Sequence, residues 1–360
     1  MNHPVAATAV KSPLQALLDS LDRLTGQRQR PRLEETLIAA LLELAGADRI
    51  AYYKIQALRD DPLYWLAVEA DAAGIRVIDD GINLPDTLLP LAERPDLAAL
   101  ATATVSTVVD EPGGACLLQP VPGPGSAHGF IAMHLREPPD AARRAMVAGL
   151  VTVFRNVMAL LDYSETDSLT GLLNRKTFDE HLMHILAALQ AADSRTGGTM
   201  PQRRGPAHEG DSHWLGVLDI DHFKRINDNF GHLIGDEVLL MVANLMRGNF
   251  RFRDKLFRFG GEEFVVVLKP TGAEQAAATF GRFRCAMEQH LFPQVGKVTI
   301  SIGFAPIRLH DQPSLVLDRA DQALYWSKEH GRNRVSSYEA LVASGELAQS
   351  PEMHTDVELF

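Results

Sequence analysis

The stretch Leu256–Leu268, with the sequence LFRFGGEEFVVVL, decides the fold of the second half of this chain. Apolar and aromatic runs flank Gly260 and Gly261. Because a Gly-Gly pair accepts the positive φ of a tight turn, the pattern predicts a β-hairpin. Glu262 and Glu263 follow directly. Adjacent carboxylates at the start of a strand need a partner, most simply a cation, unless they form an ordinary exposed turn.

A second acidic stretch, 214–224, strengthens the interpretation as a cation site. It begins with the apolar run WLGVL, which is typical of a strand buried on both faces. Asp219 and Asp221 follow this run, at the end of the strand where open α/β sheets collect ligands. If the hairpin pairs beside this strand, Asp219 and Glu262 meet in an all-oxygen site suited to Mg²⁺ and a bound phosphate. Paired metal ions there would activate phosphoryl transfer.

An ordered series of motifs, covering about half of the chain, resembles the GGDEF family of diguanylate cyclases. The matching segments are 167–175 (DSLTGLLNR), 219–228 (DIDHFKRIND), 231–232 (GH), 235–237 (GDE), 260–264 (GGEEF) and 328–333 (KEHGRN). The GGEEF hairpin alone is a modest signal, whereas the series in this order is a strong one. Trp326 and Ser327 depart mildly from the family, which often has two small residues there.

The resemblance implies a palm-like nucleotidyl cyclase domain that condenses two GTP molecules into cyclic di-GMP and releases two pyrophosphates. Each half-site holds one GTP, so the family's catalytic assembly is a homodimer. Mg²⁺ is the implied cofactor, with Mn²⁺ as the alternative. A second function stays open, because some family members lose catalysis and act as GTP or cyclic di-GMP receptors. Such members usually have a damaged hairpin motif, whereas GGEEF is intact here.

The resemblance also assigns roles to individual residues. Asp219, Glu262 and Glu263 are implied as the catalytic and metal-binding carboxylates, with the backbone carbonyl of Ile220 as a further ligand. Gly260 and Gly261 would let the backbone approach the triphosphate, because a Cβ there would collide with it. The other implied GTP contacts are Lys328 and Arg332 (phosphates), Asn227 and Asp236 (guanine), and Lys224, His232 and Arg258.

Two of these assignments have plain structural alternatives. Lys328 and Arg332 are spaced i and i+4 near a helix end, where they would otherwise form a solvated helix face. Asp236 lies near an expected helix start, where it would otherwise be an N-cap. If it is instead a buried carboxylate facing guanine, it would reject adenine by roughly 10⁴ or more.

The RxxD motif formed by Arg251 and Asp254 has the spacing to Gly260 that the family's product-inhibition site shows. An arginine stacks on guanine and forks onto phosphate, and an aspartate accepts from guanine, so the pair suits bound cyclic di-GMP. The alternative is a local Arg–Asp salt bridge.

Composition limits the other classes of function. A net charge of −11 gives no basic field for a nucleic-acid polymer. Cys116 and Cys285 lie far apart, so neither a disulfide framework nor a zinc knuckle is indicated. Neither 37–45 nor 146–154 approaches the ~20 apolar residues that span a bilayer, so we expect no membrane insertion and a cytoplasmic location.

The first part of the chain predicts an α+β domain. Helical patterns near 14–21 and 33–44 precede six short strands, expected at 49–55, 63–69, 75–78, 104–109, 116–120 and 128–135. This order resembles a GAF sensor domain, with a PAS domain as the alternative, and implies a small sensor ligand of unknown identity. Cys116 is predicted to be a small buried hydrophobe, although some GAF domains attach a cofactor through cysteine.

A helical linker is expected between the two domains. Met146, Leu150, Val153, Val157 and Leu160 step by 4, 3, 4 and 3, the spacing of a two-stranded coiled coil, which predicts dimerisation. The alternative is a helix packed within its own domain.

The expected organisation has four parts. They are a GAF-like domain at 1–138 with a loose leader at 1–12, a linker at 139–165, a GGDEF domain at 166–340 and a tail at 341–360. Within the GGDEF domain, 190–213 is expected to be a long loop. The predicted fold class is therefore a two-domain α+β and α/β protein.

Overall fold

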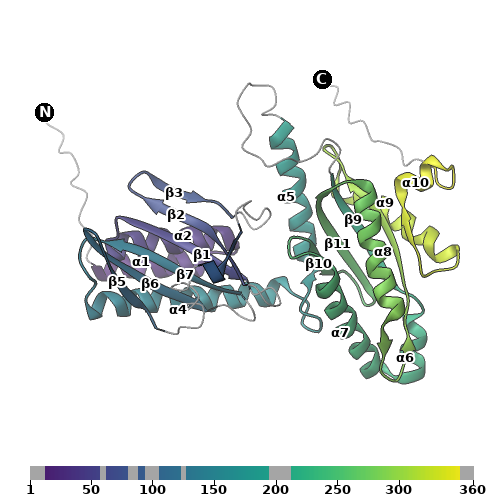
Figure 1. The fold of residues 1–360 in the computed structure, drawn as a ribbon, viewed down its shortest axis with the longest axis horizontal. Helices are drawn as coiled ribbons and strands as arrows, with labels where there is room; N and C mark the ends of the chain where they lie inside the picture. Colours follow the sequence, from purple (N-terminus) through teal and green to yellow (C-terminus); the bar gives the residue numbers. More distant parts are fainter. Residues whose placement is uncertain are drawn as a thin grey trace, which may run out of the picture. The chain divides into compact units, whose positions relative to one another are not determined.

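The computed structural model describes residues 13–56, 62–79, 88–93, 105–122, 127–193 and 212–348. The chain divides into two units, 1–164 and 165–360 (Figure 1). The expected leader at 1–12, most of the expected loop at 190–213 and the end of the expected tail lie outside the described residues.

The N-terminal unit contains an antiparallel sheet with the strand order β3-β2-β1-β7-β6-β5, and β4 pairs with β2. The strands are β1 (Arg49–Gln56), β2 (Leu63–Asp71), β3 (Gly74–Val77), β4 (Leu89–Pro90), β5 (Thr107–Glu111), β6 (Gly114–Pro122) and β7 (Ala127–Leu135). All six strands expected from the sequence are present, with end residues moved by a few positions.

One face of this sheet packs against helices α1 (Pro13–Gly26), α2 (Arg30–Ala45) and α4 (Ala141–Glu165). Helix α2 is followed by Gly46 in the left-handed conformation, with φ 63°, which is the usual way for glycine to end a helix. The other face carries a second apolar cluster made by Ile55, Tyr64, Leu91, Cys116, Leu118, Phe130 and Ala132. Cys116 is buried, as expected.

Helix α4 covers the segment expected to form a coiled coil. Leu150 and Val157 are buried in the core of the N-terminal unit, whereas Leu160 is 69% exposed. Val153 is partly buried against the same core, so the intramolecular alternative describes three of the five heptad positions. Among the described residues, α4 is also the one helix long and apolar enough to cross a membrane. This is weak evidence for a span, because core helices share that composition, and α4 contributes six buried residues to its unit.

The C-terminal unit has a mixed sheet with the order β15-β14-β9-β11-β10-β8. Its strands are β8 (Leu173–Asn174), β9 (Ser212–Ile220), β10 (Lys255–Arg258), β11 (Glu263–Thr271), β14 (Ile300–Ile307) and β15 (Val335–Ser337), and β12 (Leu291–Phe292) pairs separately with β13 (Gly296–Lys297). Strand β9 is central, buried along nearly its whole length, and antiparallel to both β11 and β14.

Six helices surround this sheet in the described part of the unit (Figure 1). They are α5 (Arg175–Asp193), α6 (Phe223–Phe230), α7 (His232–Asn249), α8 (Ala273–Gln289), α9 (Pro313–Glu329) and α10 (Tyr338–Ala343). Residues of α6, α7 and α8 form one core with Leu218, Phe264 and Ile302 of the sheet. Helix α9 packs directly on β14.

The predicted hairpin is confirmed by the antiparallel pairing of β10 with β11, but its turn is not the one expected. Neither Gly260 nor Gly261 adopts a positive φ. The connection instead runs over 259–262, and the amides of Phe259 and Gly260 both donate to the carbonyl of Glu263. Because of the longer turn, Glu262 lies outside β11, directly before its first residue.

Gly303 of β14 permits the close approach of α9. A Cβ there would lie 2.0 Å from the backbone nitrogen of Leu324 and 2.2 Å from the carbonyl oxygen of Ala320. We expect Gly303→Ala to lower the free energy of unfolding by about 3 kcal/mol, the upper part of the usual range for overpacking, because helix backbone cannot rotate away.

The matched control for Gly303→Ala is Gly281→Ala in α8, where a Cβ meets nothing within 4 Å. That change should raise stability by about 0.5–1 kcal/mol, since glycine weakens a helix interior. Calorimetric unfolding of the full chain measures both variants. Equal stability of the two would contradict the tight contact between α9 and β14.

Candidate active site

The pairing of β9 with β11 brings the predicted carboxylates together. Glu263 and Asp219 are direct partners in the register, and the amide of Ile220 donates to the carbonyl of Glu262 at 3.4 Å. Strand β14 places Ser301 opposite Asp219 on the other side. Three strand ends therefore converge where the apolar run of β9 ends, as the sequence predicts for Asp219 and Glu262.

Helix α9 adds a cation to this cluster. Lys328 Nζ lies 2.8 Å from Asp219 Oδ2. Burial raises the pKa of Asp219, and the hydrogen bond and charge of Lys328 offset only part of that effect. Burial also raises the pKa of Glu262, and the charge of Asp219 adds to it. The carboxylates thus repel one another despite the lysine.

This donor set fits a divalent metal ion. Asp219 is 5% exposed, Glu262 and Glu263 are half-buried, and all offer hard oxygen atoms. A single lysine does not balance three neighbouring carboxylates, whereas a divalent ion would relieve their repulsion. Asp321 of α9 also contributes to the field at Asp219 and interacts with Lys328. The sequence reasoning missed Asp321, although it precedes Lys328 by two helical turns.

Asp221, the first residue after β9, has a structural role. Its carboxylate accepts from Thr299 Oγ1 at 2.7 Å, Ser301 Oγ at 2.6 Å and the amide of Asn333 at 3.0 Å. Arg332 and Asn333 both have left-handed backbones, with φ 58° and 47°. Asp221 therefore holds the turn that carries Arg332 against the end of β9, and the strained backbone depends on that anchor.

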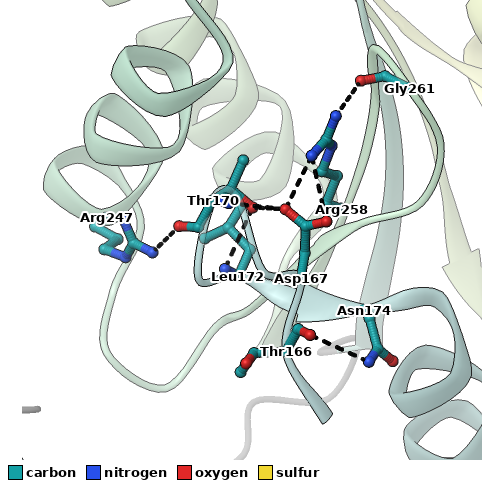
Figure 2. A network of polar contacts seen from close by, with 8 residues as sticks. All are labelled: Thr166, Asp167, Thr170, Leu172, Asn174, Arg247, Arg258 and Gly261. Carbon is teal, nitrogen blue, oxygen red and sulfur yellow. Dashed lines mark hydrogen bonds and ion pairs between the residues drawn. The ribbon is translucent and has the colours of Figure 1, made fainter. Parts of the chain in front are cut away.

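Arg258 makes contacts different from those expected (Figure 2). Its Nη1 donates to Asp167 Oδ1 at 3.0 Å, and its Nη2 donates to the carbonyl of Gly261 at 2.9 Å. Asp167 also accepts from the amide and hydroxyl of Thr170, and Thr170 in turn receives Arg247 on its carbonyl. Arg258 thus connects the segment 167–175 to the GGEEF turn and positions that turn.

The two predicted guanine contacts lie on neighbouring helices. Asn227 lies in α6, and a Cβ on Gly235 of α7 would lie 2.0 Å from Asn227 Oδ1. Gly235, the residue before Asp236, therefore makes room for the side-chain amide of Asn227. Helix α7 starts at His232 with Gly231 as its N-cap, so the N-cap alternative for Asp236 is wrong. Asp236 is exposed, as are Lys224 and His232.

The segment that contains these residues matches a known protein family. The family described as "Diguanylate cyclase, GGDEF domain" matches residues 164–334.

The C-terminal unit belongs to the GGDEF family.

The carboxylates, the lysine and the two predicted guanine contacts described above all lie inside the matched segment.

Similar curated proteins are named diguanylate cyclases. Diguanylate cyclase DgcP of Pseudomonas aeruginosa is 41% identical over 173 residues, which are 47% of this chain and 23% of that protein. Diguanylate cyclase A of Treponema denticola is 34% identical over 194 residues, which are 53% of this chain and 48% of that protein. The chain thus spans less than half the length of these relatives.

Solved structures give a further likeness. The GGDEF domain of DgcB from Caulobacter crescentus, determined with c-di-GMP, is 34% identical and aligns with a TM-score of 0.43. The alignment covers 49% of this chain and 96% of that chain.

The RxxD residues of the GGDEF domain do not form the salt bridge considered as an alternative. Asp254 Oδ2 accepts from the amide of Arg251 at 2.9 Å, and Oδ1 accepts from the amide of Lys269 at 3.2 Å. Burial raises the pKa of Asp254, and these amides oppose the effect. The Arg251 side chain is exposed. Asp254 therefore shapes the bend before β10, and the arginine presents its guanidinium to solvent.

Proposed function

We propose that this chain is a diguanylate cyclase, which joins two GTP molecules into cyclic di-GMP and releases two pyrophosphates. The observation that carries the proposal is the meeting of Asp219, Glu262 and Glu263 beside Lys328 in a GGDEF domain. In the proposed reaction, the 3′-hydroxyl of one GTP attacks the α-phosphate of the other. The names of the curated relatives support this activity.

We propose Mg²⁺ as the cofactor, with Mn²⁺ as a substitute, held by Asp219, Glu262, Glu263 and the carbonyl of Ile220. When bound, the cation would neutralise charge that develops during phosphoryl transfer. Lys328 and Arg332 would bind phosphate oxygens as a point charge and a fork. Asn227 and Asp236 would select guanine.

The test is incubation of the purified full chain with GTP and Mg²⁺, followed by chromatography of the products. We expect cyclic di-GMP and pyrophosphate in a ratio of one to two. Binding of GTP or cyclic di-GMP without any turnover would contradict the cyclase and favour the receptor function.

Dimerisation follows from the proposed chemistry, since each GGDEF domain would hold one GTP. Leu160 and Tyr163 of α4 are 69% and 79% exposed, and they offer an apolar surface to a second copy. We expect Leu160→Lys with Tyr163→Lys to lower both the dimer population in sedimentation velocity and the rate of cyclic di-GMP synthesis, because buried charge opposes association.

Leu14→Lys is the control for the dimer variant, because Leu14 of α1 is similarly exposed, at 66%. Its dimer population and rate should match those of the wild type. An unchanged dimer in the Leu160 and Tyr163 variant would show that α4 is not the dimer contact. Charged substitutions at Leu150 and Val157 would be a poor test, because both belong to the core of their own unit.

The N-terminal unit is proposed to be a GAF-like sensor of a small ligand that controls the rate. Its central antiparallel sheet, covered on one face by helices, supports this class. We also propose a cytoplasmic location, which the free cysteines Cys116 and Cys285 support.

Product inhibition is proposed to act through Arg251. The exposed guanidinium would stack on guanine of bound cyclic di-GMP while Asp254 keeps the bend in shape. We expect Arg251→Ala to relieve inhibition by micromolar cyclic di-GMP and to leave the initial velocity nearly unchanged. Arg144→Ala, which removes an exposed arginine of the N-terminal unit, should be inhibited like the wild type. Progress curves without inhibition in the wild type would refute this assignment.

A further inference from the structure

Three different metal-ligating side chains meet on the N-terminal sheet. They are Glu111 on β5, Cys116 on β6 and His134 on β7, and their ligand atoms all lie within 4.8 Å of one another. The three strands are adjacent, and β5 ends the described strand order. Cys116 and His134 are direct partners in the register. Cys116 lies on the face opposite the helices, so the cluster does too.

The register explains why Glu111 reaches this group. Its direct partner on β6 is Gly114, two residues before Cys116, so Glu111 and Cys116 lie on the same face of the sheet. The carboxylate extends to His134, where Glu111 Oε2 lies 2.8 Å from His134 Nδ1. Cys116 is 4% exposed, whereas the side chains of Glu111 and His134 are 38% and 37% exposed. One side of the cluster is closed by the core, and the other is open to an ion from solvent.

The combination of sulfur, nitrogen and oxygen donors determines which ions fit. Mg²⁺ and Ca²⁺ prefer oxygen ligands, whereas a thiolate with an imidazole and a carboxylate suits Zn²⁺. Bond lengths of about 2.0–2.3 Å around tetrahedral zinc put its ligand atoms about 3.3–3.8 Å apart. The ligand atoms of this cluster lie between 2.8 Å and 4.8 Å apart, a range that includes that spacing. Burial raises the pKa of the Cys116 thiol to about 11, which argues against a nucleophilic or redox-sensing role.

We propose that Glu111, Cys116 and His134 bind Zn²⁺, with a fourth coordination position open to water or another ligand. The proposal makes the N-terminal unit a transition-metal-binding unit. It is independent of the activity of the GGDEF domain, whose carboxylates form an all-oxygen set. The two sites would therefore select different metals by ligand chemistry.

Cobalt titration of the reduced, chelator-treated full chain tests the site, with excess Mg²⁺ present to occupy oxygen-only sites. A thiolate ligand gives Co²⁺ a near-ultraviolet charge-transfer band, which should saturate at one equivalent and disappear when Zn²⁺ is added. Cys116→Ser should abolish the band, and Cys285→Ser, the matched control in the other unit, should retain it. A cooperative thermal unfolding transition in each variant is the control that the variant is folded.

Variants of the two exposed ligands make the test independent of the buried cysteine. Glu111→Gln and His134→Gln should each weaken Zn²⁺ binding at least tenfold, since even residues that only support a metal ligand are worth about 10–100-fold. Zn²⁺ should also raise the Tm of the wild type more than that of either variant. The absence of a charge-transfer band in the wild type, or its persistence in Cys116→Ser, would overturn the proposal.

Discussion

Glu262→Gln and Asp219→Asn are each expected to lower the rate of cyclic di-GMP synthesis by about three orders of magnitude. Each change removes one negative charge from the cluster at the ends of β9 and β11 while keeping the shape of the side chain. A metal ion contributes several kcal/mol to phosphoryl transfer, and each ~1.4 kcal/mol is tenfold in rate. Initial rates at saturating GTP and Mg²⁺ measure the effect.

The control for these variants is Glu274→Gln, which neutralises an exposed carboxylate in the first turn of α8. Its rate should equal that of the wild type. The two site variants should fold normally, because neither carboxylate supports the backbone as Asp221 does. Near-normal synthesis by folded Glu262→Gln would show that the metal assignment is wrong.

The pKa shift of Glu262 adds a second readout that does not depend on turnover. Burial and the charge of Asp219 raise this pKa in the folded state. Between the ordinary carboxyl pKa and the raised one, the folded protein binds more protons than the unfolded protein, so the free energy of unfolding falls as pH rises. Without a divalent metal, wild-type stability should therefore decline relative to Glu262→Gln across that window. Mg²⁺ should restore it in the wild type only.

Most of the fold of the C-terminal unit was predictable, because the sequence patterns that mark its helices and strands are local and repeat along each element. The apolar runs of β9 and β11 identify two strands, and their acidic ends predict the meeting of Asp219 with the Glu262 and Glu263 pair. Helix α2 was also predictable, since the helical pattern at 33–44 lies within it.

Turn geometry and side-chain partners were less predictable. A Gly-Gly pair permits positive φ but does not require it, and here the amides of Phe259 and Gly260 close a longer turn. Asp254 and Asp221 resemble ligands in the sequence, yet both accept hydrogen bonds from backbone amides. The amides of Lys269 and Asn333 belong to other segments, so the sequence around each aspartate carries no sign of these two partners.

Helix α4 shows why a heptad pattern is ambiguous. Apolar residues at spacings of three and four fit both a partner helix and the sheet of the same unit. Leu150 and Val157 pack on the sheet, whereas Leu160 remains exposed. The cluster of Glu111, Cys116 and His134 was likewise invisible, because a strand register brings together residues that no sequence spacing relates.

The second large effect is expected in base selection by the GGDEF domain. We expect kcat/KM for GTP to exceed that for ATP by about 10²–10⁴. Asp236 can accept from the N1–H and the 2-amino group of guanine, and hydrogen bonds to a charged group are worth about 1.5–3 kcal/mol each. The sequence alone favoured 10⁴ or more, on the premise of a buried carboxylate. Asp236 is exposed, so water can solvate it when adenine occupies the site.

Two variants separate the guanine contacts. Asp236→Asn should lower kcat/KM for GTP by about 10–100-fold, the value of one charged hydrogen bond, and should leave that for ATP nearly unchanged. Gly235→Ala reaches Asn227 indirectly, because the new Cβ would lie 2.0 Å from Asn227 Oδ1 and must displace the amide. It should weaken GTP use without altering either guanine contact chemically.

Gly281→Ala is the control for Gly235→Ala, since both lie in helices but a Cβ at 281 meets nothing. Its GTP-to-ATP ratio should equal that of the wild type. Because Gly235 is buried, thermal unfolding must first show that Gly235→Ala is folded. If the folded wild type turns over ATP as well as GTP, or if Asp236→Asn leaves the ratio unchanged, then guanine is not read by Asn227 and Asp236. Any preference for GTP over ATP would in that case come from residues outside α6 and α7.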